Sequence, residues 1–166
     1  MVTSSAPGKV YLFGEHAVVY GEPAVPCAIG VRARVTVTRR EEGLRVRAGD
    51  LSLDGFAVEY DGDTSTPEVD VPENLLDAAM GYINEAVAQA RTAASERGVD
   101  AGETGFEVVV DSDIPLGAGL GSSAAVVVAA IDAATRELGV ELPREELADR
   151  AYQVEHAVQD GGASRA

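Results

Sequence analysis

The sequence predicts a domain built from both β-strands and α-helices, and three observations support this prediction. Small apolar residues alternate with polar ones along residues 31–38, as in a strand that has one solvent-facing side. Apolar residues recur at helical spacing along residues 72–97. A third segment alternates at residues 105–111 and continues through a glycine-rich loop into an alanine-rich run at residues 122–138. That run has no Gly or Pro and is typical of a buried helix.

The composition is that of a folded chain with a strongly acidic surface. Of its 166 residues, 46% are hydrophobic, enough for one domain with a substantial core or for part of a two-domain protein. The formal net charge is −15, from 13 basic and 28 acidic residues. Because such a charge repels nucleic acid and anionic membranes, we expect neither as a partner. Lys9 is the one lysine, and this scarcity, together with the acidity, indicates a protein from a high-salt cytoplasm.

Several features favour a cytoplasmic location. No segment of the sequence resembles a transmembrane span, and residues 1–14 are interrupted by a Pro-Gly-Lys triplet, unlike a signal peptide. The single cysteine, Cys27, cannot form an internal disulfide, which fits a reducing compartment. Its apolar neighbours favour a small buried core residue over a reactive thiol.

The first predicted strand covers residues 10–13 and is entered through a turn at Pro7 and Gly8. Lys9 lies at the start of this strand. Since the chain uses arginine elsewhere, a lysine here indicates a need for a compact point charge. Glu15 and His16 follow the strand, at a place where catalytic groups are common. An ordinary Glu–His pair in a loop is the alternative.

The sequence in the middle of the chain predicts strands, a loop and a helix that support the fold and carry no candidate functional residues. Short alternating runs at residues 44–47, 51–53 and 56–60 predict an antiparallel meander, and the acidic segment 61–71 predicts a loop. The helix of residues 72–97 has a proline in its first turn. Its apolar stripe, which we expect to pack on the sheet, consists of Leu75, Leu76, Ala79, Met80, Ile83, Val87 and Ala90.

The stretch of residues 115–125 has the sequence PLGAGLGSSAA and joins a predicted strand to a predicted helix. Its alternating glycines permit positive φ and a close approach of ligand to backbone. The free N–H groups of such a loop and the positive end of the helix dipole favour phosphate. The loop lacks the lysine of a Walker motif, the third glycine of the dinucleotide fingerprint and the G-x-S-x-G elbow of hydrolases. Two interpretations remain: a phosphate site in which Ser122 or Ser123 caps the helix or binds a metal, and a plain turn with a Ser N-cap.

The last predicted helix runs from Pro143 to about Gln159, after Gly139 has ended the helix before it. Its buried stripe consists of Leu147, Ala151, Val154 and Val158. Glu155 neighbours this stripe and could point inward. A surface Glu on a polar helix edge is the alternative.

Two of these stretches resemble motifs of the GHMP kinases, a family of small-molecule kinases that have neither a Walker loop nor a protein-kinase fold. Residues 115–125 resemble the second motif of the family, and residues 7–10 with 14–16 resemble its first motif. The continuation at residues 17–25 is similar to that of members that act on mevalonate. The resemblance covers most of residues 4–159 and is strongest at its two ends.

The resemblance implies an α+β fold, the GHMP kinase N-terminal domain (ribosomal protein S5 domain 2-like), with a mixed sheet covered by helices. It implies transfer of the γ-phosphoryl group of ATP to the 5-hydroxyl of mevalonate in isoprenoid biosynthesis. The implied contacts to ATP phosphates are made by Pro115, Gly117, Ala118, Gly119, Leu120, Gly121, Ser122, Ser123 and Ala124.

The resemblance also assigns roles outside the loop. Lys9 would be catalytic and lie near the attacking hydroxyl, Glu15 and His16 would contact mevalonate, and Ser123 and Glu155 would hold Mg²⁺. Another GHMP kinase, such as one that acts on phosphomevalonate, remains an alternative, as does a non-catalytic nucleotide-binding module. A homodimer of the complete enzyme also remains open.

Two parts of the family pattern are missing from the sequence. The family's catalytic base is an aspartate in a Gly/Ser-rich turn after the last helix; Asp160 comes too early, and no plausible match follows before Ala166. The third, C-terminal glycine-rich motif is absent as well. We therefore expect residues 1–166 to be a truncated N-terminal ATP-binding domain that lacks the C-terminal domain and is inactive by itself.

Overall fold

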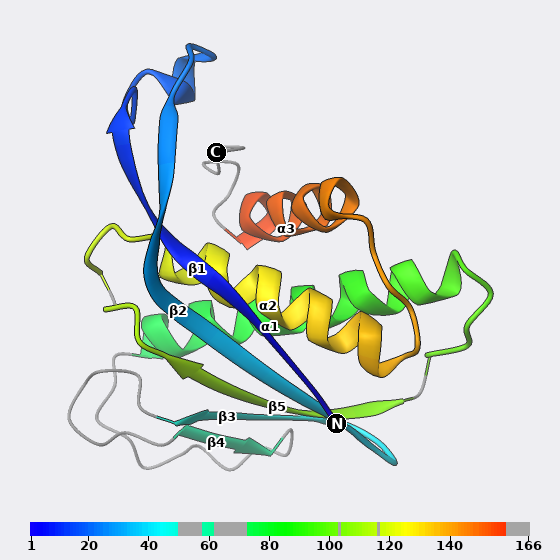
Figure 1. The fold of residues 1–166 in the computed structure, drawn as a ribbon. Helices are drawn as coiled ribbons and strands as arrows, with labels where there is room; N and C mark the ends of the chain where they lie inside the picture. The colour runs from blue at the N-terminus through cyan, green and yellow to red at the C-terminus, as the bar shows by residue number, and fades with distance from the viewer. Residues whose placement is uncertain (50–57, 62–72, 103, 116, 159–166) are drawn as a thin grey trace.

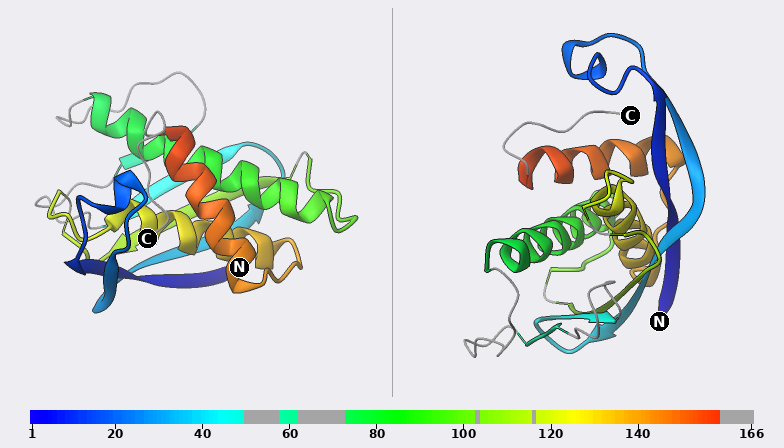
Figure 2. Two further views of the ribbon diagram at one scale, coloured as in Figure 1. Left: turned by 90° about the horizontal axis from the view of Figure 1, so that it is seen from above. Right: turned by 90° about the vertical axis from the view of Figure 1, so that its left-hand side faces the viewer.

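The computed structural model describes residues 1–49, 58–61, 73–102, 104–115 and 117–158. Within these residues a five-stranded sheet carries three α-helices on one of its faces (Figure 1). α2 (Ser122–Glu137) packs on the sheet and α1 (Glu73–Ser95) lies beside it. α3 (Arg144–Val158) lies over both of these helices, on the side away from the sheet (Figures 1 and 2). The predicted mixed sheet covered by helices is confirmed.

The strands of the sheet follow the order β1-β2-β5-β3-β4. Their bounds are β1 Val2–Phe13, β2 Val25–Arg40, β3 Leu44–Gly49, β4 Val58–Asp61 and β5 Gly105–Ser112. Three pairs are antiparallel, whereas β3 and β5 run parallel.

The predicted antiparallel pairing of the runs at residues 44–47 and 56–60 agrees with β3 and β4, which are antiparallel neighbours. β5, which comes later in the chain, lies between β2 and β3. β5 carries Phe106, Val108 and Val110 on its helix-facing side, and all three are buried. Such a strand gains most from a central place beneath the helices, where its edges are paired on both sides. Alternation shows which face of a strand is buried, but it does not show the order of the strands.

The predicted turn at Pro7 and Gly8 is wrong, since β1 passes through both residues. The strand pairs with β2 from Val2 to Phe13, and its register shifts between Pro7 and Lys9. β1 is an edge strand, in which a proline need not cost a ladder hydrogen bond. The irregularity at this position is what allows the strand to continue.

The helices agree with their predicted spans to within about two residues at each end, the usual uncertainty of helix limits. Gly139 follows α2 with φ +85°, a left-handed conformation that ends a helix. In the described residues, no helix combines the length and the apolar character that crossing a membrane requires. The predicted strand at residues 51–53 and most of the predicted loop at 61–71 lie outside the described residues.

The core lies between the sheet and α2. α2 buries seven apolar residues, five of them alanines, against its neighbours; among them are Ala129, Ala130 and Ile131. Small side chains let this helix approach the sheet, α1 and α3 closely. The predicted α1 stripe is buried at Met80, Ile83, Val87 and Ala90, and the α3 stripe at Ala151 and Val154.

The far end of the β1–β2 hairpin projects from the body of the domain (Figure 1). It carries η1 (Val18–Tyr20) and several exposed apolar side chains, including Phe13 at 75% and Tyr20 at 84% exposure. Cys27 lies in this part of β2 and is exposed, so its predicted burial is wrong. Its apolar neighbours meet no core, because the hairpin extends past the helices.

Candidate active site

The glycine-rich loop packs against the first strand, so the two sequence motifs meet in space. The backbone N–H of Lys9 donates to the carbonyl oxygen of Leu120, with an N···O distance of 2.9 Å. A Cβ on Gly8 would come within 2.9 Å of the same oxygen. Position 8 must therefore lack a side chain for the loop to lie against the strand at this distance.

The side chain of Lys9 crosses the start of α2. A Cβ on Gly121 would lie 2.9 Å from Cγ of Lys9 and 3.3 Å from its Cε. Gly121 is the N-cap of α2 and has φ +71°. A glycine is thus required there for two reasons, backbone conformation and room for the lysine. The Lys9 ammonium nitrogen lies 3.0 Å from the hydroxyl oxygen of Tyr11.

The loop itself has the backbone that its spacing predicts. Gly117, Gly119 and Gly121 have φ of +72°, +70° and +71°. A Cβ on either of the first two would meet nothing within 4 Å, so space beside the loop is open. Residues Pro115 and Ala118 are exposed, and Leu120, Ser122, Ser123 and Ala124 are half-buried.

The two serines begin α2 without capping it. Gly121 takes the N-cap position and no side chain makes a cap hydrogen bond, so the alternatives in which a serine caps α2 are wrong. The first N–H groups of a helix have no partner within the helix. No acidic residue occupies the first turn of α2, so nothing there repels an anion. Open space, free N–H groups and the helix dipole are together the features that favour the binding of an anion.

Glu155 lies on α3, and its carboxylate is partly buried. Its Oε1 atom is buried and has no hydrogen-bond partner among the described residues. An unpaired buried carboxylate oxygen is unfavourable, and a cation or a donor from a ligand would relieve the cost. The described residues hold no group of three or more His, Cys, Asp or Glu side chains that could bind a metal by themselves. Mg²⁺ fits such a sparse site, because it takes few protein ligands and fills its shell with water and phosphate oxygens.

Glu15 and His16 lie away from the contact between Lys9 and the glycine-rich loop. Both are exposed, in the turn that follows β1 at the projecting end of the hairpin. A Cβ on Gly14 would come within 2.5 Å of the carbonyl oxygen of Pro23, so the turn begins where the chain folds tightly onto itself. Within the described residues, neither side chain makes a hydrogen bond, ion pair or ring contact with Lys9 or the loop, and the Lys9 ammonium contacts Tyr11 instead.

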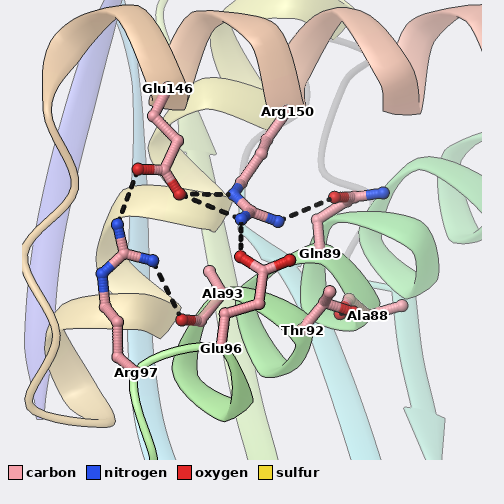
Figure 3. A network of polar contacts seen from close by, with 8 residues as sticks. All are labelled: Ala88, Gln89, Thr92, Ala93, Glu96, Arg97, Glu146 and Arg150. Carbon is pink, nitrogen blue, oxygen red and sulfur yellow. Dashed lines mark hydrogen bonds and ion pairs between the residues drawn. The ribbon is translucent and has the colours of Figure 1, made fainter.

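A charged network fastens α3 to α1 (Figure 3). The side chain of Arg150 is 11% exposed and pairs with Glu96, which directly follows α1, and with Glu146, at 2.9 Å from Nη2 to Oε1. Arg97 donates to the other oxygen of Glu146 at 2.6 Å. The hydrogen bonds from Arg97 and Arg150 hold the pKa of Glu146 below its ordinary value. This network was not predicted from the sequence, although the spacing of Glu146 and Arg150 is that of a helical ion pair.

A second contact anchors the other end of α3. A Cβ on Gly81 of α1 would lie 3.7 Å from Cγ1 of Val158, so the two helices are in close contact there. Glu155 therefore lies between two places at which α3 is held against α1.

The chain is similar to known kinases over nearly its whole length. The family model described as GHMP kinases N terminal domain matches residues 81–165. The mevalonate kinases of Thermococcus onnurineus and Pyrococcus furiosus are each 41% identical over 164 residues, which cover 98% of this chain and 46% of the relative. The crystal structure of the Methanococcus jannaschii mevalonate kinase matches with a TM-score of 0.74 and 29% identity, over 98% of this chain and 48% of that one. The chain thus spans about half the length of the proteins that it matches.

Proposed function

The chain belongs to the GHMP kinase family, and on this premise we propose that it is the ATP-binding part of a mevalonate kinase. The reaction would transfer the γ-phosphoryl group of ATP to the 5-hydroxyl of mevalonate. The observation that carries the proposal is the contact of Lys9 with the glycine-rich loop, since it joins a cation to an anion site. The relatives named as mevalonate kinases support the choice of substrate.

The loop would bind the phosphates of ATP. Its N–H groups and those of the first turn of α2 donate to phosphate oxygens, and the open space beside Gly117 and Gly119 admits them. Phosphoryl transfer depends mainly on positioning and on neutralising charge, and this arrangement supplies both.

Lys9 would act at the reacting hydroxyl. Its side chain runs across Gly121, so its ammonium group lies near the end of the loop that would hold the transferred phosphoryl group. A fixed positive charge there favours the alkoxide character of the hydroxyl and stabilises charge on the transferred group. Such a charge contributes more to the transition state than to the binding of ATP.

Ser123 and Glu155 would hold Mg²⁺. The buried, unpaired Oε1 of Glu155 supports its part in this set, and the hydroxyl of Ser123 is not used in a cap. The metal would neutralise phosphate charge when bound. The two anchors of α3 would keep the Glu155 carboxylate in place.

Glu15 and His16 would contact mevalonate from the exposed turn after β1. We also propose that residues 1–166 form the ATP-binding domain and that the catalytic base lies outside them. The length of the relatives, about twice that of this chain, supports this division.

A coupled assay of ADP release tests the proposal on the full-length protein that the gene encodes. With ATP and Mg²⁺ present, we expect turnover with mevalonate and none with phosphomevalonate, galactose or homoserine. Turnover with another of these acceptors alone would assign a different member of the family. Nucleotide binding without turnover on any acceptor would favour a non-catalytic module.

The same assay on the 166-residue chain tests the division into domains. We expect no turnover, because a general base contributes roughly 10²–10⁴-fold in rate. Turnover near about one per second, an ordinary enzymatic rate, would show that the base lies within these residues.

A further inference from the structure

Tyr11 is in direct contact with the charged end of Lys9. The two residues are two apart in β1, with no register shift between them, so their side chains leave the strand on the same face. The Lys9 ammonium donates to the Tyr11 hydroxyl at 3.0 Å and lies 4.7 Å from the centre of the Tyr11 ring. Neither residue of this pair is fully exposed.

The Lys9 side chain is confined along its whole length. Its stem crosses the backbone of Gly121, and its ammonium meets both the ring face and the hydroxyl of Tyr11. A free lysine side chain samples many rotamers and loses that freedom when it must reach one point. A lysine that is already restrained on two sides loses less when a ligand arrives.

We propose that Tyr11 is a positioning residue, which holds the Lys9 ammonium in place at the start of α2. The consequence for catalysis rests on the proposed function, whereas the contact itself does not. Tyrosine suits this task because its ring attracts a cation and its hydroxyl accepts a hydrogen bond from it. Phenylalanine would keep the attraction of the ring for the cation but lose the hydrogen bond, and leucine would lose both.

The restraint can be measured without any assay of activity. Because Lys9 is the only lysine of the 166 residues, lysine-selective ¹³C labelling gives a single set of ε-methylene signals. In the wild type we expect the chemical shifts of these signals to differ from those of a free lysine, because of the ring current of Tyr11. Tyr11→Phe should keep most of this difference, and Tyr11→Leu should move the signals to the position of a free lysine.

Tyr82→Phe is the matched control for the loss of a phenolic hydroxyl, since Tyr82 lies on α1. It should leave the Lys9 signals unchanged. Wild-type signals in the Tyr11→Leu variant, with the remaining spectrum still that of a folded protein, would overturn the proposal. Signals of a free lysine in the wild type would overturn it as well.

Steady-state kinetics of the full-length protein test the consequence for catalysis. Tyr11→Phe should lower kcat by roughly tenfold, the loss of one hydrogen bond to a charged group, with little change in KM for ATP. Tyr11→Leu should lower kcat further. An unchanged kcat in Tyr11→Leu would overturn the positioning role, whereas a wild type inactive on mevalonate would overturn the proposed function and leave the NMR result standing.

Discussion

At the scale of single residues, the site depends on two positions whose residues have no Cβ atom. Gly8 and Gly121 let the loop and the lysine lie where a Cβ would collide with them. The sequence predicted the glycines of the loop from their spacing, because alternate glycines indicate positive φ. The requirement at Gly8 arises from the carbonyl of Leu120, a hundred residues away in the chain, and no local pattern contains it.

Gly121→Ala should destabilise the domain by about 1–2 kcal/mol more than Gly117→Ala. Both alanines would need a positive φ, but only the one at position 121 would also meet the Lys9 side chain at 2.9 Å. Urea unfolding of the two variants measures the difference in the free energy of unfolding. Equal losses would show that Lys9 moves aside without cost.

Lys9→Met should lower kcat of the full-length protein far more than it raises KM for ATP, because the charge acts mainly in the transition state. Arg136→Met serves as the control: it also removes a cation, one that is exposed near the opposite end of α2. A Lys9→Met variant with wild-type kcat and only a raised KM would assign the lysine to nucleotide binding instead.

At the scale of elements, the sequence predicted which segments form helices and strands better than it predicted how they pair. The 3.6-residue stripes of α1 and α3 and the glycine after α2 are local signals, and the structure agrees with them. The place of β5 between β2 and β3 depends on long-range packing. The exposure of Cys27 likewise depends on how far the hairpin extends past the helices, which its apolar neighbours do not show.

The ion pairs that join α3 to α1 predict a dependence of stability on pH. Hydrogen bonds from Arg97 and Arg150 lower the pKa of Glu146 in the folded state below its ordinary value of 4.5. A lowered pKa means that the stabilisation is complete above about pH 4.5 and is lost as the pH falls through the lower value. Glu146→Gln should therefore be less stable than the wild type at neutral pH, and the difference should vanish in acid.

Urea unfolding at neutral pH and at the lowest pH at which the domain stays folded measures this difference. Glu145→Gln is the matched control, because Glu145 is the exposed neighbour of Glu146 in the first turn of α3. A Glu146→Gln effect that persists undiminished in acid would mean that the carboxylate charge is not what stabilises the helix pair.

At the scale of the whole molecule, the charge of −15 sets the conditions under which the fold is stable. Its self-repulsion is poorly screened at low ionic strength. The ion pairs on the outer face of the sheet are exposed, as in the pair of Arg34 with Asp113, and each contributes little.

We therefore expect the melting temperature to be higher at about 2 M KCl than at about 0.1 M, because salt screens the repulsion. Sorbitol at matched osmolality is the control for effects of solvent other than charge. An equal or lower melting temperature at high salt would contradict the expectation.

The hydrogen bond from Lys9 to Leu120 also bears on the order in which the domain folds. It joins the first strand to a loop that comes after all five strands and α1. Contacts between such distant segments require closure of a long loop and tend to form slowly, whereas the β1–β2 hairpin is closed by a short one. A growing chain could pair these two strands early, yet it could not complete the anion site until the loop had been synthesised. Nucleotide that binds the loop as proposed would therefore recognise only chains in which this long-range contact has formed, and its binding would report that step of folding.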